Sequence, residues 1–388
     1  MKIIKVLLLT ILFPTSCLFG HNIEVSLITC APGSEIYELE GHTGLRVNIP
    51  GVGDYVANWG IFDFNTPNFV YRFTKGETDY MMAFEPTAHF LNRYAATGRA
   101  VLEQTVDLSD EEAEMLLNLM QTNALPENRT YRYNYIKDNC ATRPFSLICR
   151  SVGDSLILND SPEFGSFRDA MMNFHSNYPW YQFGIDLALG SDIDRPTTLR
   201  DEIFAPVRLA EIIRTAKRKD GRPIISSERM LVVAENSPVL PPTPFFLSPL
   251  FISLIVAAIT FFLCIYSILH RTQAKIWTFI LYMIFGLCGL VLTFLIFISS
   301  HEATGHNWLY LCLNPLPLII ALSLLIKRLE KLSYLLQIIN FALVFILLII
   351  AAAGIQHLNT AFYPLIVSDL MCSATYIYIY KCQKKFHN

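Results

Sequence analysis

Apolar residues are concentrated in five long stretches in the C-terminal part of the chain. Each stretch is about 20 residues or longer, which lets an α-helix rising 1.5 Å per residue cross a bilayer core of about 30 Å. The pattern predicts five transmembrane helices, at Ser248–His270, Ile276–Ser299, Trp308–Ile326, Leu332–Gly354 and Ala361–Tyr380. Asp369 is the one carboxylate inside these spans, and such residues usually face a bundle interior.

The charges between the spans predict their orientation. Basic residues fall in alternate connections and in the tail, at Arg271, Lys275, Lys327, Arg328, Lys331, Lys381, Lys384 and Lys385. The opposite loops, 301–307 and 356–360, contain no Lys or Arg. Because basic loops stay in the cytoplasm, we expect residues 21–244 outside the inner membrane and the C-terminus in the cytoplasm.

The N-terminus has the pattern of a signal peptide. Two lysines in Met1–Lys5 precede the apolar run Val6–Phe13, and we expect residues 1–20 to be removed. The following Pro14–Cys17 resembles a lipobox only in part, so cleavage after Gly20 and lipidation of Cys17 both stay open. The predicted domains are then an exported domain at 21–235, a proline-rich linker at 236–247, the spans at 248–380 and a cytoplasmic tail at 381–388.

Composition supports this division. Of all residues, 53% are hydrophobic and 16% are charged, whereas soluble proteins carry about a quarter charged residues. From residue 245 onward there are eight Lys and Arg against three Asp and Glu, which leaves 22 against 30 in the preceding part. The exported domain is therefore acidic, and an acidic surface argues against nucleic-acid binding.

The exported domain combines strand and helix patterns, which predicts an α+β fold. A β-type run covers 25–29, and runs at 45–49 and 55–59 flank a turn-rich break, as in a hairpin. A helix is expected over 108–120, with Ser109 as N-cap and Glu112 completing a capping box. Further helices are expected near 140–152 and over 199–217, the latter interrupted at Pro206.

The exported domain holds three cysteines, of which Cys140 has the most distinctive surroundings. Asp138-Asn139-Cys140-Ala141-Thr142 places the thiol at a helix start, where backbone N–H groups favour the nucleophilic thiolate. Cys149 lies among apolar residues and fits a small buried thiol. A disulfide between Cys30 and Cys149 is an alternative, since exported proteins form such bonds.

A thiol nucleophile needs a base and a group that orients the base. His42, in Gly41-His-Thr-Gly44, lies at the start of the first hairpin strand between small residues, which leaves its ring accessible. Asn58 on the next strand is the candidate to hold that ring, with Asp54 and Asp63 as alternatives. We expect His89 and His175 to be polar surface or core residues.

Several motifs together resemble a known bacterial family. They are Thr29–Tyr37, Gly41–Arg46, Asn58–Phe64, Phe69–Gly76, Tyr133–Thr142 (YNYIKDNCAT) and Phe183–Gly190 (FGIDLALG), followed by the loop His301–Trp308. Their order resembles the lipoprotein N-acyltransferases whose exported domain is similar to circularly permuted papain-like thiol enzymes of the NlpC/P60 type. His42 precedes Cys140, as the permuted order requires. The resemblance implies Cys140 as nucleophile and His42 as base, with Asn58 as third member.

The resemblance also implies a reaction. Cys140 would take an acyl chain from a phospholipid as a thioester and pass it to the α-amine of an S-diacylglyceryl-cysteine lipoprotein at the membrane surface. We expect further substrate-binding residues at His301, Asn307, Trp308, Asn139 and Arg46. The loop with His301 and Trp308 could equally be an interfacial anchor. We expect no cofactor and no metal, because no motif has zinc-ligand spacing.

Two other functions use the same residues. A membrane-tethered peptidoglycan hydrolase would need the same Cys140 and His42, but one span would suffice to tether it. A sensor or assembly factor would keep the fold without chemistry, and it would not need both the thiol and the imidazole. The sequence leaves the donor headgroup, the acyl position and the oligomeric state undetermined.

Overall fold

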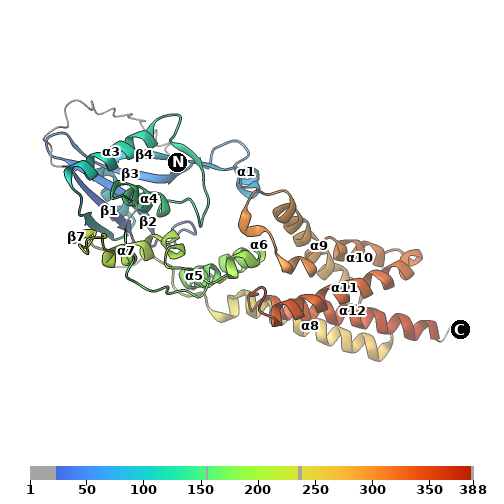
Figure 1. Ribbon diagram of the computed structural model, residues 1–388. Helices are drawn as coiled ribbons and strands as arrows, with labels where there is room; N and C mark the ends of the chain where they lie inside the picture. Colours follow the sequence, from blue (N-terminus) through green and yellow to red (C-terminus); the bar gives the residue numbers. More distant parts are fainter. Residues whose placement is uncertain (1–22, 154–155, 235–237, 386–388) are drawn as a thin grey trace. The chain divides into compact units, whose positions relative to one another are not determined.

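The computed structural model describes residues 23–153, 156–234 and 238–385, and these form two compact units. Within the described residues, the first unit contains residues up to 73, 77–165 and 196–240, and the second contains 74–76, 166–195 and 241 onward. Figure 1 shows the strands of the first unit and the long helices of the second. The expected signal peptide, including Cys17, lies outside the described residues.

The first unit is built on a seven-stranded sheet with the order β6-β4-β3-β2-β1-β5-β7. All neighbouring strands pair antiparallel. The strands are β1 (Glu24–Cys30), β2 (His42–Ile49), β3 (Gly53–Ile61), β4 (Asp79–Pro86), β5 (Val101–Val106), β6 (Thr130–Arg132) and β7 (Ile225–Val232). The hairpin expected from the sequence is confirmed as β2–β3, and Gly51 supplies the positive φ of 77° that its turn requires.

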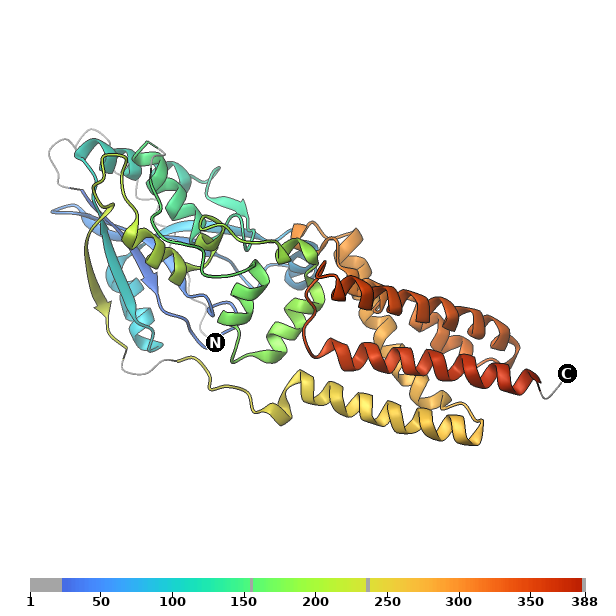
Figure 2. The ribbon, with the colours of Figure 1, turned by 60° about the horizontal axis from the view of Figure 1, so that its bottom comes forward.

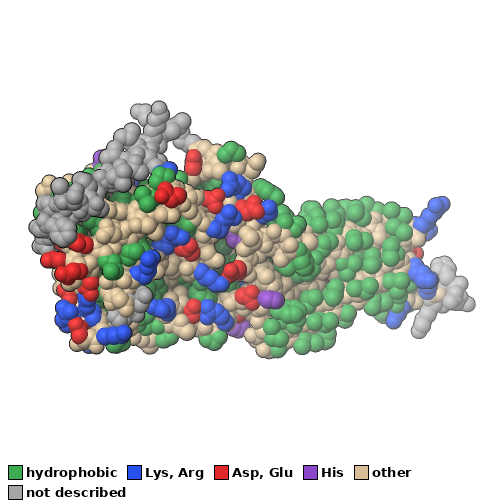
Figure 3. Space-filling view, turned by 45° about the horizontal axis from the view of Figure 1, so that its top comes forward, with side chains coloured by type: hydrophobic (Ala, Val, Ile, Leu, Met, Phe, Trp, Pro, Cys, Tyr) green, Lys and Arg blue, Asp and Glu red, His purple; other side chains and the backbone are tan. Residues whose placement is uncertain are grey.

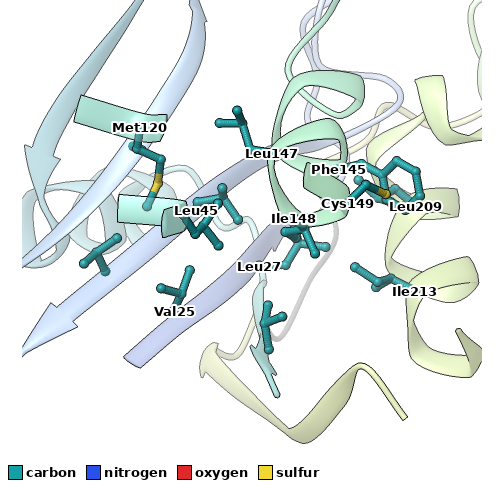
Figure 4. Packing of buried hydrophobic residues seen from close by; sticks show 14 of the residues in the cluster. Val25, Leu27, Leu45, Met120, Phe145, Leu147, Ile148, Cys149, Leu209 and Ile213 are labelled. Atoms are coloured by element: carbon teal, nitrogen blue, oxygen red, sulfur yellow. The ribbon is translucent and has the colours of Figure 1, made fainter. Parts of the chain in front are cut away.

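Helices pack on both faces of this sheet. They are α2 (Thr87–Ala96), α3 (Asp110–Ala124), α4 (Thr142–Ser151) and α7 (Pro206–Thr215), with a short 3₁₀ turn at Asp201–Phe204. Helix α1 (Phe69–Lys75) has no buried residue. Figure 4 shows Leu27 and Leu45 from the sheet packed with Ile148 of α4 and Ile213 of α7. A smaller cluster on the other face contains Ile28 of β1 and residues of α2, because neighbouring strand residues point to opposite faces.

The local signals in the sequence set the helix starts. Ser109 caps α3 and Glu112 completes the capping box, as predicted. Pro206 is the first residue of α7, where its missing N–H costs nothing, so the predicted interruption is confirmed. Helix α4 begins at Thr142, after Cys140, so the predicted helix from Cys140 starts too early.

The second unit is helical. It contains α5 (Phe167–Phe174), α6 (Pro179–Ala188), α8 (Pro249–His270), α9 (Lys275–Phe297), α10 (Leu316–Leu324), α11 (Glu330–Ala352) and α12 (Phe362–Lys385), with 3₁₀ turns at Ser191–Asp194, Phe245–Leu247, Glu302–Thr304, Trp308–Leu311 and Lys327–Leu329. Helices α11 and α12 run side by side (Figure 2). Figure 3 shows hydrophobic side chains covering these helices, with Lys and Arg gathered at one end.

Four described helices, α8, α9, α11 and α12, are long and apolar enough to cross a membrane. The third expected span differs, because Trp308–Leu324 consists of a 3₁₀ turn, an irregular step and the nine-residue α10. Asn314 stabilises the step, since its side chain accepts the Leu316 N–H and donates to the Leu311 carbonyl. The five-helix prediction is therefore confirmed for four helices only.

The irregular step packs closely on α9 because α9 carries glycine at 286 and 289. A Cβ at Gly289 would overlap the backbone of Asn314, and one at Gly286 would overlap Leu318. Irregular backbone at membrane depth is tolerated only where protein surrounds it. The two glycines provide that close contact.

The disulfide considered for the first unit is not formed. Cys30 ends β1 in the cluster with α2, whereas Cys149 lies in α4 in the larger core on the opposite face. Neither cysteine takes part in a disulfide within the described residues. The sheet itself separates the two thiols, so this alternative is wrong.

Residues 166–195 fold with the helical unit, although the sequence groups them with the exported domain. Arg168 is buried and forms ion pairs with Asp186 at 2.7 Å and Asp194 at 2.6 Å. Asn359, in the loop before α12, donates to the second oxygen of Asp186 at 2.8 Å. The buried Arg168 guanidinium and its two carboxylate partners therefore connect α5 and α6 to the loop before α12.

Gly190 makes the closest backbone contact in this segment. Its N–H donates to the Ala303 carbonyl at 2.9 Å, and a Cβ there would overlap the carbonyl oxygen of Gly305. A Cβ at Gly184, six residues earlier in α6, would meet no atom within 4 Å. The glycine that ends the FGIDLALG motif is thus required by packing.

We predict that Gly190→Ala destabilises the helical unit by on the order of 2 kcal/mol, because backbone must move to admit the methyl group. Thermal unfolding of the purified protein in detergent measures this. Gly184→Ala is the matched control, and it should keep or raise the midpoint because alanine favours helix. Equal midpoints for both variants would contradict the packing argument.

Candidate active site

Cys140 lies in the loop between β6 and α4, and the neighbouring Asn139 holds that loop in place. The buried Asn139 side chain accepts the N–H groups of Ala141 and Thr142 at 2.8 and 2.9 Å, which caps the start of α4. Its amide group donates to the carbonyls of Tyr135 and Phe204. Both lone pairs and both N–H groups of this side chain are thus used in fixing the loop, which indicates a positioning role.

The loop places the Cys140 thiol beside the start of β2 and the end of β3. The backbone N–H of Thr43, the residue after His42, donates to the Cys140 sulfur. On the other side, a Cβ placed on Gly60 would lie 3.7 Å from the Cβ of Cys140. The β2 residue beside the thiol is therefore the one that directly follows His42.

His42 and Asn58 come together through strand register. Gly44 pairs with Asn58, so His42 and Asn58 are diagonal neighbours on the same face of the sheet. His42 Nε2 lies 2.6 Å from Asn58 Oδ1, which is a short hydrogen bond. Asn58 is buried and His42 is half-buried.

Glu85 on β4 fixes the orientation of the Asn58 amide. Asn58 Nδ2 donates to Glu85 Oε1 at 3.1 Å, and Arg93 donates to both Glu85 oxygens at 2.7 and 3.1 Å. An ionised carboxylate only accepts, so the amide must turn its oxygen toward His42. His42 therefore carries its proton on Nε2, and the lone pair of the neutral ring is on Nδ1.

Burial keeps both the imidazole and the thiol neutral. Loss of hydration lowers the pKa of His42 to about 4, and the hydrogen bond to Asn58 only partly offsets this. Burial likewise raises the pKa of Cys140 to about 11, against the opposing effect of the Thr43 N–H. The thiolate expected at a helix start is therefore absent at rest, because α4 begins after Cys140 and burial outweighs the N–H donors.

Two further residues of the candidate site, Glu40 and Glu85, were not predicted from the sequence. Glu40 is buried two residues before His42, and its carboxylate accepts a hydrogen bond from the Tyr135 hydroxyl. This bond joins the β2 start to the loop that carries Cys140. Neither Glu40 nor Glu85 has a local signal, because each acts through strands and loops distant in sequence.

The other carboxylates considered for orienting His42 have different partners. Asp54 pairs with Arg46 and accepts the Thr87 hydroxyl. Arg46 also pairs with the buried Glu103, so the structure gives Arg46 a role within the sheet. Asp63 accepts the backbone and side-chain amides of Asn65 in an exposed turn.

His89 and His175 match their expected roles. His89 is exposed on α2. His175 is buried and its Nδ1 lies 2.7 Å from Gln182 Oε1, as in a satisfied core histidine.

The substrate-binding residues expected in the second half lie in the helical unit. Asn307 is buried, and its side chain bonds to the Leu187 carbonyl, the Leu309 N–H and Gln356. Trp308 is 38% exposed, as an interfacial anchor would be. His301 is half-buried, its N–H bonds to Ser299, and His306 is exposed beside Asp192. The hydrogen bonds of Asn307 indicate a structural role for this side chain. Substrate binding by His301 and Trp308 stays a prediction.

Alkylation of Cys140 should report the raised thiol pKa. At pH 8 only about 0.1% of a thiol with this pKa is ionised, so iodoacetamide should react slowly. We predict a rate that rises about tenfold per pH unit from about pH 7 to about pH 10. Mass spectrometry of the peptide containing Cys140 measures the rate. A plateau below about pH 7 would instead reveal a preformed thiolate–imidazolium pair.

Two family models match the chain. The family model described as the Lnb N-terminal periplasmic domain matches residues 18–169, which include His42, Asn58 and Cys140. The model described as the Lnb transmembrane domain matches residues 242–385. No curated protein and no solved structure matches significantly. The chain has both domains in order along its length, and it belongs to the Lnb family of lipoprotein N-acyltransferases.

Proposed function

We propose that this membrane protein transfers an acyl chain from a phospholipid, through a thioester on Cys140, to the α-amine of an S-diacylglyceryl-cysteine lipoprotein. The observation that carries the proposal is the placement of the Cys140 thiol at Thr43, the residue that follows His42 in β2. Cys140 accepts the Thr43 N–H, while the adjacent His42 is held by Asn58 with Nδ1 left as acceptor. Nucleophile, base and orienting amide are the parts that covalent acyl transfer needs.

The first half-reaction forms the thioester. As Cys140 Sγ attacks the ester carbonyl of the phospholipid, its proton passes to His42 Nδ1. The tetrahedral intermediate then expels the glycerol oxygen, which takes the proton from His42 and leaves as a lysophospholipid. The resting pair is neutral, so proton transfer must accompany the attack.

The second half-reaction forms the amide. The uncharged α-amine of the lipoprotein attacks the thioester carbonyl and gives a proton to His42 Nδ1. Collapse of the intermediate returns that proton to Cys140 Sγ, which restores the enzyme. The Thr43 and Cys140 backbone N–H groups both lower the pKa of the thiol, and they are the proposed donors for the developing oxyanion.

The helical unit supports a lipid substrate. Four of its helices are long and apolar enough to span a bilayer, and the family places the N-terminal domain in the periplasm. Basic residues between the spans favour a cytoplasmic C-terminus. In this orientation the catalytic domain works at the outer face of the inner membrane, where both lipid substrates are available.

Intact mass of the purified protein after incubation with phospholipid tests the first step. We expect wild type to gain one acyl chain that hydroxylamine removes, and Cys140→Ser to gain none. His42→Gln should charge about 10²- to 10⁴-fold more slowly, which is the usual contribution of a general base. Cys149→Ala is the control, since that thiol is buried in α4.

A hydrolase that cleaves cell-wall peptides would give the opposite pattern. Wild type would then remain uncharged with every phospholipid while cutting peptidoglycan fragments in a manner that needs Cys140. That result would overturn the acyltransfer proposal.

A further inference from the structure

An exposed aromatic surface lies on the first unit, formed by Tyr37, Phe62, Phe64, Phe69 and Phe73. Tyr37, Phe64 and Phe73 are 57%, 60% and 50% exposed, which is unusual for large apolar rings. Ile36 and Val70 beside them are also exposed. Contiguous apolar surface of this kind marks a site that contacts another apolar group.

The rings of this aromatic surface touch one another. The Phe62 and Phe64 centroids are 4.7 Å apart, and those of Phe64 and Phe69 are 5.1 Å apart. Tyr37 lies edge-on to Phe62 at 6.2 Å, and Phe73 stacks on Phe69 at 6.0 Å. Ring contacts of this spacing form one continuous apolar face.

The aromatic surface continues inward to the nucleophile. Phe62 contacts Tyr80 at 5.0 Å between ring centroids, and Tyr80 stacks on Tyr133 at 4.3 Å. Phe62 follows Gly60 by two residues, and a Cβ on Gly60 would lie 3.7 Å from the Cys140 Cβ, within van der Waals contact. Phe62, Tyr80, Tyr133 and Cys140 also belong to one packed cluster. The exposed rings and the thiol are therefore ends of one apolar path.

Helix α1 carries two of these rings, and its last residue, Lys75, belongs to the helical unit. The backbone N–H and hydroxyl of Ser300 both donate to the Lys75 carbonyl at 2.9 Å, within the helical unit. Ser300 follows the end of α9 by three residues. Phe69 and Phe73 precede Lys75 in α1, so the chain continues from these rings directly into the helical unit.

We propose that the aromatic surface holds the fatty acyl chain of the phospholipid donor while its ester reaches Cys140. This inference rests on the proposed function, and it names the part of the donor that the domain recognises. An acyl chain has no hydrogen-bonding groups, so flat apolar rings match it along its length. The path ends at Cys140, where the ester carbonyl must be placed. Recognition would thus depend on chain length more than on headgroup.

A chain-length series tests the aromatic surface directly. The full-length protein in detergent is charged with a dipalmitoyl or a dibutyroyl phospholipid of the same headgroup, and acylation of Cys140 is followed by intact mass. We expect Tyr37→Ser/Phe64→Ser to lower kcat/KM for the long-chain donor about tenfold, since ring contacts to the chain are lost. The same variant should charge from the short-chain donor within about twofold of wild type, because that donor reaches few of the rings.

Met115→Ser is the matched control, because Met115 is also 50% exposed but lies on α3. It should leave both donors unaffected. As a second measurement that needs no variant, a donor with a photoreactive acyl tail should cross-link to peptides within residues 36–73 of wild type. The inference would be overturned if the double variant lost kcat/KM equally with both donors, or lost it with neither. Cross-links confined to other peptides would also overturn it. In each case acylation of the wild type would still support the proposed function. Failure of wild type to charge from either donor would refute the proposed function itself.

Discussion

The hydrogen bond between Asn58 and His42 is the interaction on which the chemistry of the site depends. It has a fixed direction because Glu85, itself held by Arg93, accepts from the other end of the Asn58 amide. The direction assigns the proton of His42 to Nε2 and leaves the lone pair on Nδ1, which takes the thiol proton in the proposed mechanism. Glu85 thus determines the tautomer of His42 through the Asn58 amide that lies between them.

The same site is neutral at rest, and this suits an enzyme that works beside a membrane. Burial lowers the pKa of His42 and raises the pKa of Cys140. A neutral thiol is less readily oxidised than a thiolate, which protects the sulfur in an oxidising compartment. Asn139 fixes the loop that carries Cys140, and in the proposed mechanism this loop and the Thr43 N–H hold the sulfur ready for attack on an ester. In this mechanism the position of the thiol promotes its attack on the ester, because the thiol is not ionised beforehand.

Local patterns allowed much of the fold and part of the site to be predicted. The capping box at Ser109, the β2–β3 hairpin and four long apolar helices follow from spacing and turn chemistry that neighbouring residues carry. The broken third span and the segment 166–195 could not be predicted, because glycine contacts and a buried Arg168 join residues far apart in sequence. Glu85 was missed for the same reason, since only strand pairing brings it to Asn58.

The proposed thioester should react with an amine and not with water. The charged protein, separated from donor, is mixed with a diacylated lipopeptide or with its N-acetylated form, and the acyl chain is followed by mass. The account predicts rapid transfer to the unblocked amine as an amide, with the N-acetylated peptide leaving the thioester intact. Release of fatty acid at one rate with both peptides, and no acylated peptide, would contradict it.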